Sequence, residues 1–151
     1  ANKIHRSFIA FFIAEVSSRV LQENEQNIEL FNFIWNSALN LYSLENIEKN
    51  FPIKYLLDLS KFLGFYPSSV SINKAFFELE SGGFSDKKNP LKTYFNKEES
   101  TYLKALIRGE KTTIPQIKKS NFLKKVLCYY KLHHYNLDGI TSHLVIEALR
   151  Q

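Results

Sequence analysis

The sequence predicts a mostly α-helical fold: a bundle of about six helices with a small β insertion around residues 75–85. Three observations lead to this prediction. Apolar residues recur at helical spacing through most of the chain. One short segment instead alternates apolar and acidic residues and is followed by Ser81-Gly82-Gly83. The 151 residues are 44% hydrophobic and 23% charged, which is typical of one folded domain with a single core.

The first two helices are expected over residues 4–22 and 28–42. In the first, apolar side chains occupy much of the circumference, so we expect a central and largely buried helix. Asn27 can cap the second helix, because its side-chain oxygen can accept a free backbone N–H. In the second helix the apolar residues form one repeating stripe, which comprises Ile28, Phe31, Ile34, Trp35, Ala38, Leu39 and Tyr42.

A third helix is expected to open at Asn50-Phe51-Pro52, because the first turn does not need the N–H that proline lacks. Gly64 is well placed to end it in a left-handed conformation, and Pro67 prevents its continuation. The β insertion follows, with a short strand near residues 75–80 and a hairpin completed near Phe84. Aromatic residues cluster here, either as core filling, which we favour, or as platforms for single-stranded bases; they are Phe65, Tyr66, Phe76, Phe77, Phe84, Tyr94 and Phe95.

Three further helices complete the predicted bundle. The first covers residues 97–108. The second is a long helix that Ser120 or Asn121 could cap and that runs to about His134. The last covers residues 142–150.

Positive charge is concentrated in the C-terminal part of the chain. The net charge is +5, but residues 1–60 hold five Lys/Arg against seven Asp/Glu, whereas residues 87–131 hold twelve Lys/Arg against three Glu. Neighbouring ammonium groups can hold phosphates by releasing counterions, and because Lys outnumbers Arg we expect contacts that are indifferent to base sequence. The alternative is a merely solvated, lysine-rich surface. The candidate DNA-binding residues are Lys87, Lys88, Lys92, Lys104, Arg108, Lys111, Lys118, Lys119, Lys124 and Lys125.

The search for catalytic and metal-binding patterns is mostly negative. The sequence has no glycine-rich phosphate loop, nucleophile elbow or metalloprotease helix motif. Glu78 and Glu80 would share one face of a strand and could bind a cation, but a solvated strand face explains them without further assumptions. Cys128 and His133 lie five residues apart on one helix, so their side chains diverge. We therefore expect no catalytic residue, no metal and no cofactor.

The expected location is the cytoplasm, with no membrane contact. No apolar run approaches the roughly 20 residues that span a bilayer. The single cysteine fits a reducing compartment. The sequence contains no methionine and enters a helical pattern directly after Ala1-Asn2, which favours an excised domain over a processed terminus.

Six stretches cover nearly the whole chain: Ile4–Val16, Glu29–Ile34, Tyr55–Pro67, Phe76–Phe84, Leu127–His133 and Ile140–Leu149. In their order and spacing they resemble the C-terminal part of RecO proteins of the Bacteroidetes type. The first is similar to the helix that follows the N-terminal domain in that family, the third to a helix that ends in Leu-Gly and a proline, and the fourth to the insertion that comes next.

The resemblance implies that residues 1–151 form the helical domain of a two-part protein whose N-terminal OB-fold domain is absent from this chain. Such a protein would be a non-catalytic mediator of recombination in DNA repair, working in the cytoplasm at the nucleoid. It would bind single- and double-stranded DNA, anneal complementary strands and, with its partner RecR, help load the RecA recombinase. It would also bind the acidic, hydrophobic C-terminal tail of the single-stranded DNA-binding protein.

A second hypothesis is a pure protein-interaction adaptor, with DNA binding confined to the missing N-terminal domain. An acidic tail that ends in an aromatic residue needs an apolar pocket rimmed by cations. The candidates for that rim lie on the early helices and are Arg6, Arg19, Lys54 and Lys61.

The sequence departs from the family in its β insertion. Many members carry a four-cysteine zinc site after the proline, whereas residues 68–96 contain no cysteine. We therefore expect no zinc here. The insertion must then be held by packing, with Phe76, Phe77, Leu79 and Phe84 as its anchors.

Overall fold

The computed structural model describes residues 2–24, 26–43 and 47–140. It confirms the predicted class, mostly helical with a small β insertion, and has five helices in this part of the chain. The helix expected over residues 142–150 lies outside the described residues. The elements, in chain order, are α1 (Asn2–Gln22), α2 (Ile28–Ser43), α3 (Phe51–Leu63), β1 (Phe76–Glu78), β2 (Gly83–Ser85), α4 (Lys97–Arg108) and α5 (Gln116–Leu132).

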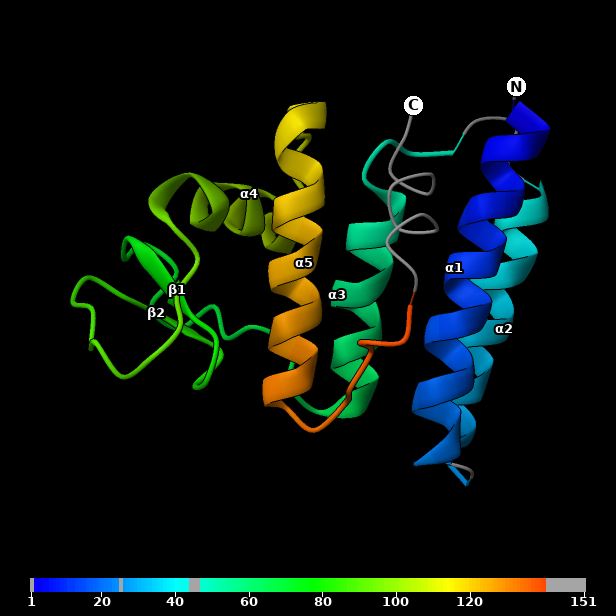
Figure 1. Cartoon of the computed structure of the whole chain (residues 1–151), viewed down its shortest axis with the longest axis horizontal. Helices are drawn as coiled ribbons and strands as arrows, with labels where there is room; N and C mark the ends of the chain where they lie inside the picture. The colour runs from blue at the N-terminus through cyan, green and yellow to red at the C-terminus, as the bar shows by residue number, and fades with distance from the viewer. Residues whose placement is uncertain (1, 25, 44–46, 141–151) are drawn as a thin grey trace.

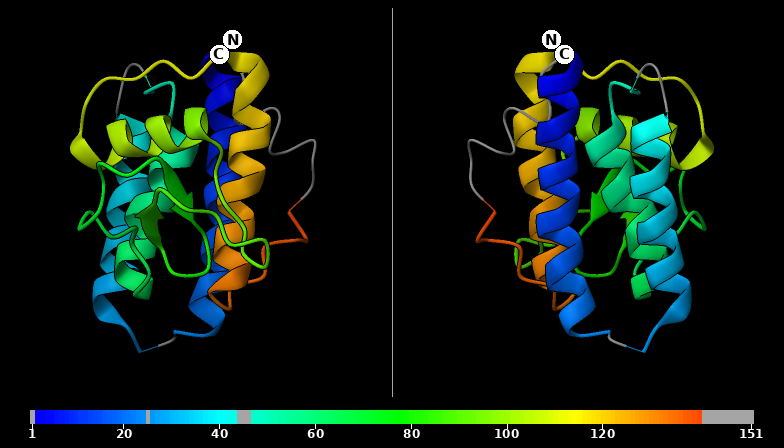
Figure 2. Two further views of the ribbon diagram at one scale, coloured as in Figure 1. Left: turned by 90° about the vertical axis from the view of Figure 1, so that its left-hand side faces the viewer. Right: turned by 90° about the vertical axis from the view of Figure 1, so that its right-hand side faces the viewer.

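The molecule is elongated, with different elements at its two ends (Figure 1). α1 and α2 form an antiparallel pair at one end, and the β1–β2 hairpin lies with α4 at the other. Between them α3 and α5 run side by side in the same direction, in contact with each other. Figure 2 shows the same arrangement from both ends and places the starts of α3 and α5 at the same end of the bundle.

The α1–α2 pair buries only part of its apolar surface. α1 buries one face, which includes Phe12 and Val16, but Phe11 is 62% exposed. The prediction of a largely buried first helix is therefore wrong for its outer face. The α2 stripe also faces outward: five of its members are 51–75% exposed, namely Ile28, Phe31, Trp35, Leu39 and Tyr42.

α2 packs on the core through its other side. Leu30 and Leu41 are buried there, and the Phe33 ring stacks on the rings of Tyr55 and Phe62 of α3. The helix starts as predicted, because the Leu30 N–H donates to the Asn27 side-chain oxygen at 3.0 Å.

The centre of the core lies between α3 and α5. Leu56 and Leu59 are fully buried, and the hydroxyls of Tyr129 and Tyr130 donate to the main-chain oxygens of Phe65 and Leu56. Because a buried hydroxyl needs a hydrogen-bond partner, these two bonds fix the position of α5 along α3. α3 ends at Gly64, whose φ of 94° is left-handed as predicted.

The β insertion is a two-stranded antiparallel hairpin that is held by packing, as predicted. Phe77 is fully buried and lies against the rings of Phe84, Phe95 and Tyr129. The His133 ring nitrogen hydrogen-bonds to the Leu79 main-chain oxygen at 2.8 Å, which joins the hairpin to the end of α5. Phe76, another predicted anchor, is only half-buried, whereas Leu79 and Phe84 are buried.

α5 starts earlier than the sequence suggested. Neither Ser120 nor Asn121 caps it, because the helix begins at Gln116 with Pro115 as its N-cap residue. The N–H groups of Lys118 and Lys119 donate to the Pro115 oxygen at 2.8 and 3.1 Å. The fixed φ of proline favours such a start, and the four residues that follow are compatible with a helix.

Candidate nucleic-acid interface

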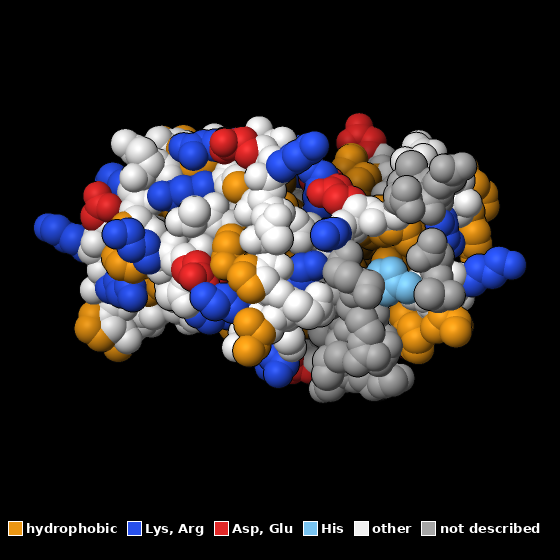
Figure 3. Space-filling view, turned by 90° about the horizontal axis from the view of Figure 1, so that it is seen from above, with side chains coloured by type: hydrophobic (Ala, Val, Ile, Leu, Met, Phe, Trp, Pro, Cys, Tyr) orange, Lys and Arg blue, Asp and Glu red, His pale blue; other side chains and the backbone are white. Residues whose placement is uncertain are grey.

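The candidate DNA-binding residues lie at the hairpin end of the molecule and on the adjoining helix α5. Lys87, Lys88 and Lys92 lie on the connection between β2 and α4, Lys104 and Arg108 lie on α4, and the rest lie on α5 or just before it. In the space-filling view of Figure 3, Lys and Arg side chains are frequent over the end that holds the hairpin and α4, with fewer acidic side chains between them. These elements are therefore neighbours in space, although 38 positions separate the first candidate, Lys87, from the last, Lys125.

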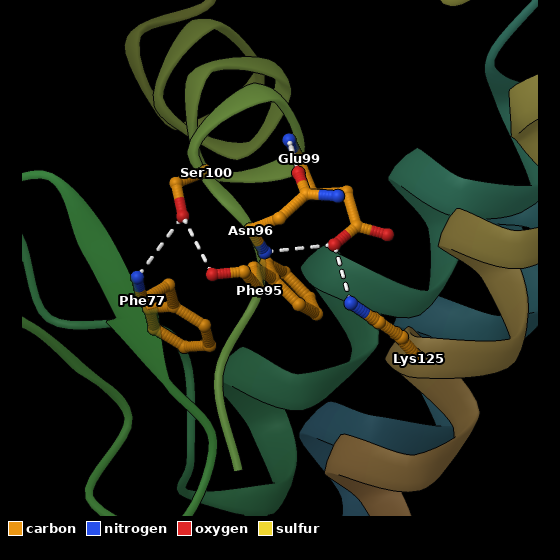
Figure 4. Close-up of polar contacts among 6 residues, drawn as sticks. All are labelled: Phe77, Phe95, Asn96, Glu99, Ser100 and Lys125. Atoms are coloured by element: carbon orange, nitrogen blue, oxygen red, sulfur yellow. Dashed lines mark hydrogen bonds and ion pairs between the residues drawn. The ribbon is translucent and has the colours of Figure 1, made fainter. Parts of the chain in front are cut away.

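A polar junction fixes these elements relative to one another (Figure 4). Asn96 and Glu99 form a capping box at the start of α4, with the Glu99 N–H donating to Asn96 at 2.7 Å and the Asn96 N–H donating to Glu99 at 2.8 Å. The Lys125 ammonium of α5 donates to the same Glu99 carboxylate at 2.6 Å. One nearly buried carboxylate therefore ties α4 to α5.

Ser100 extends this junction to the hairpin. Its buried hydroxyl accepts a hydrogen bond from the Phe77 N–H at 3.0 Å and donates to the Phe95 oxygen at 3.4 Å. Because Phe77 belongs to β1, the hairpin is positioned by α4 directly. The loop with three of the candidate lysines thus projects from a fixed base.

Ion pairs neutralise some of the predicted cations. Lys118 pairs with Glu98 at 2.5 Å and Arg108 with Glu110 at 4.0 Å, in addition to the pair of Lys125. The hydrogen bond from Lys118 lowers the pKa of the Glu98 carboxyl. Arg108 and Lys118 remain about half exposed and Lys125 is partly buried, and the partners reduce the positive potential of all three.

Lys119 differs from the other candidates because it is only 3% exposed. Its ammonium donates to the main-chain oxygen of Lys49 at 3.2 Å. Burial, and then the charge of Lys49, lowers the pKa of Lys119. A buried ammonium does not reach a phosphate on the surface, so Lys119 leaves the candidate set. The exposed candidates outside these ion pairs are Lys87, Lys88, Lys92, Lys111 and Lys124, of which Lys92 lies near the Glu80 carboxylate.

Two candidate lysines lie over aromatic rings of the hairpin. The Lys88 ammonium is 4.2 Å from the centre of the Phe76 ring, and that of Lys104 is 5.5 Å from the centre of the Phe84 ring. Such contacts orient the side chains while leaving the charge available. Most of the aromatic cluster is core, as we favoured: Phe65, Phe77, Phe84 and Phe95 are buried.

The four candidate partner-binding residues do not form one site. Arg6 donates to the Leu41 oxygen near the start of α1, while Arg19 donates to the Asn136 oxygen at 3.4 Å, about 20 Å further along the helix at 1.5 Å per residue. Lys54 and Lys61 lie on either side of Asp58 on α3, and the Lys61 ammonium is 4.7 Å from the centre of the Tyr66 ring.

Sequence analysis missed two contributors to this region. Lys97, at the exposed start of α4, adds a cation that the clustering of charge could have included. Glu99 is the junction carboxylate, and the Asn96-x-x-Glu99 spacing is a readable capping-box pattern. Among the described residues, no three His, Cys, Asp or Glu side chains are placed to hold a metal ion.

Comparison with known proteins identifies the family. Residues 1–136 match the family model described as "Recombination protein O C terminal". The chain belongs to the RecO family. It is 26% identical over 150 residues to a protein of Azobacteroides pseudotrichonymphae and 29% identical over 153 residues to one of Flavobacterium psychrophilum, each named "DNA repair protein RecO". A protein of Phocaeicola vulgatus with the same name is 27% identical over 151 residues.

The RecO match covers almost all of this chain but not all of its relatives. The alignments cover 95–97% of this chain and 61–63% of the three relatives, so the chain spans about three fifths of their length. No solved structure matches it. Among the described residues, no helix combines the length and the apolar character that crossing a membrane requires.

Proposed function

We propose that this chain is the C-terminal helical part of a non-catalytic recombination mediator in DNA repair, and that its hairpin end contacts the DNA backbone. One observation carries the proposal: exposed lysines project from elements that the Glu99 junction holds together. The names of the relatives, "DNA repair protein RecO", support the same process.

The chemistry of these lysines suits phosphate rather than bases. Lys87, Lys88 and Lys92 lie within six residues on one exposed connection, so their ammonium groups can follow a strand of phosphates. Lysine is a point charge without the planar fork that reads base edges, so we expect binding of single- and double-stranded DNA with little sequence preference. Binding should weaken steeply as salt is added.

The wider proposal places the domain in a larger protein. An OB-fold domain would precede it, and the whole would anneal complementary strands and act with RecR and the tail of the single-stranded DNA-binding protein to load RecA. It would work in the cytoplasm, at the nucleoid. These partners follow from the family resemblance. α2 lies at the opposite end of the molecule from the hairpin, so it offers a separate surface for them.

A pair of matched triple variants tests the DNA contact. Lys87→Gln/Lys88→Gln/Lys92→Gln removes three charges from the hairpin end, whereas Lys3→Gln/Lys54→Gln/Lys61→Gln removes three from α1 and α3. We expect the first to weaken binding of a labelled single-stranded oligonucleotide by about tenfold or more at low salt, and to reduce the salt slope by about two. The control should change little in fluorescence anisotropy. Equal weakening by both would show that net charge alone, not this surface, drives binding.

A second candidate function is the pure protein-interaction adaptor, which the exposed α2 stripe favours. An apolar helix face with a single charged residue, Glu29, is suited to a protein partner and not to phosphates. Titrating an acidic tail peptide of a single-stranded DNA-binding protein against the chain separates the two functions. Peptide binding without oligonucleotide binding would favour the adaptor.

A further inference from the structure

A cavity of about 190 Å³ lies where the starts of α3 and α5 meet. It is lined by Lys49 and Asn50 before α3, by residues 112–116 before and at the start of α5, and by Lys119. Since α3 and α5 run parallel, both helices point their N-terminal ends at this place (Figures 1 and 2). None of the lining residues is acidic.

The two helix starts and the Lys119 ammonium make the electrostatic potential of the cavity positive. Each helix start carries a partial positive charge, and neither α3 nor α5 has an acidic residue in its first turn or a side-chain cap. The Lys119 ammonium is almost fully buried, and its bond at 3.2 Å goes to a neutral main-chain oxygen. A buried cation without a carboxylate beside it is costly, and an anion in the cavity would stabilise it.

Asn50 adds a second, independent feature. It is 4% exposed, and its side-chain N–H donates to the Thr112 oxygen at 2.9 Å, which fixes the orientation of the amide. Its side-chain oxygen is buried and has no hydrogen-bond partner in the described structure. An unsatisfied buried oxygen favours a ligand that brings an O–H or N–H donor together with its negative charge.

We propose that the cavity binds a protonated phosphate group, with its charged oxygens toward Lys119 and the two helix starts and its P–O–H donating to the Asn50 oxygen. Inorganic phosphate keeps a proton at neutral pH, whereas sulfate does not. An internal DNA phosphodiester also lacks one, so this site is distinct from the hairpin-end surface. The phosphate can be free or, at about pH 6 where a phosphate monoester still keeps a proton, the terminal group of a nucleotide, so the nucleotide is titrated at that pH. The proposal does not depend on the DNA-binding one.

Isothermal titration of the chain with inorganic phosphate and with sulfate, at equal ionic strength, tests the site. We expect phosphate to bind and sulfate to bind at least about tenfold more weakly, because sulfate leaves the Asn50 oxygen unpaired. Titration with thymidine 5′-monophosphate and with thymidine then separates the sources. Tighter binding of the nucleotide identifies a terminal phosphate, and tighter binding of phosphate identifies the free ion.

Three variants make the test specific. Lys119→Met removes the buried charge and Asn50→Asp, nearly isosteric, turns the acceptor into an anion; each should weaken phosphate binding by about tenfold or more. Lys131→Met, at an exposed position near the other end of α5, is the matched control and should bind as the unchanged chain does. Equal affinity for phosphate and sulfate, thymidine binding as tight as that of its nucleotide, or undiminished phosphate binding by Asn50→Asp would overturn the proposal.

Discussion

The two ends of the molecule close the same core but present opposite chemistry to solvent. At one end, α2 carries a single charged residue, Glu29, and an exposed apolar stripe around Trp35. At the other, the hairpin and α4 bury their rings and expose lysines. The difference indicates two kinds of partner: an apolar protein surface for α2 and an anionic polymer for the hairpin end.

The ends also differ in what holds them. The hairpin end depends on a few buried side chains and on the Glu99 junction, since its strands are only three residues long. The α1–α2 end consists of long helices whose packing is spread over many contacts. Changes at the hairpin end should therefore have larger local effects than changes at the α1–α2 end.

Phe77→Ala should be the most damaging substitution at the hairpin end. It removes a fully buried ring that contacts Phe84, Phe95 and Tyr129, so we expect a loss of about 3–5 kcal/mol in the free energy of unfolding. Urea unfolding measures the loss, and hydrogen exchange should show α4 and the hairpin opening before α1. Phe11→Ala, at the exposed face of α1, is the control and should cost less than about 1 kcal/mol. Similar losses in the free energy of unfolding for both variants would show that the two ends do not differ in this way.

Alkaline pH should act on the other side of the core through Tyr55. Burial raises the pKa of Tyr55 to about 12, although a hydrogen bond with Ser17 of α1 lowers it in part. Because the pKa of Tyr55 in the folded chain lies above the ordinary 10.0, burial of the neutral phenol contributes stability that is fully present below pH 10. This contribution to the free energy of unfolding is lost as the pH rises towards 12. The loss is about 2–3 kcal/mol for a shift of two units.

Comparison with Tyr55→Phe isolates this contribution. The variant cannot ionise at that position, so its free energy of unfolding should fall less between neutral pH and pH 12 than that of the unchanged chain. Chemical unfolding at both pH values measures the difference. Identical losses in the two proteins would mean that Tyr55 does not titrate with the raised pKa.

Glu99→Gln tests how much the Glu99 junction contributes to the free energy of unfolding. The substitution removes the charge that holds Lys125 but keeps an oxygen for the Asn96 N–H, so we expect a loss of about 1–2 kcal/mol. Glu98→Gln changes the neighbouring, exposed carboxylate and serves as the control. If the two variants unfold at the same denaturant concentration, the Glu99 junction does not stabilise the hairpin end.

The smallest effect is expected at Trp35. Its side chain is 57% exposed, so Trp35→Ser should change the free energy of unfolding by less than about 1 kcal/mol. Trp35 is the single tryptophan of the chain, and its fluorescence should be readily quenched by acrylamide. A blue-shifted emission with weak quenching would show that α2 is covered, and the contrast between the ends would then need revision.

Helix positions were largely predictable from this sequence because their signals are local. Gly64 and Gly109 end α3 and α4 in left-handed conformation, as short-range patterns indicate. The buried side of α2 was not predictable, since apolar residues occupy both sides: Phe33 packs inward while Trp35 faces solvent. Only the packing of α3 against α2 selects between them.

The candidate site was likewise predictable where its signal is local in the sequence and not where it depends on packing. The concentration of lysines in residues 87–131 is plain in the sequence, and most of these side chains are exposed, at the hairpin end and on α5. The sequence could not separate Lys118, which is exposed, from Lys119, which is buried, because the difference depends on how α5 is rotated against the residues before α3. The cavity near Lys119 likewise requires two helix starts that lie far apart in the sequence.

Amide chemical-shift perturbation can map where a single-stranded oligonucleotide contacts the chain, and so tests the DNA contact of the hairpin end. We expect the largest changes in residues 86–95 and in α4, little change in α2, and a decline of all changes as salt is added. Changes that centre on α2, or that persist at high salt, would contradict this contact.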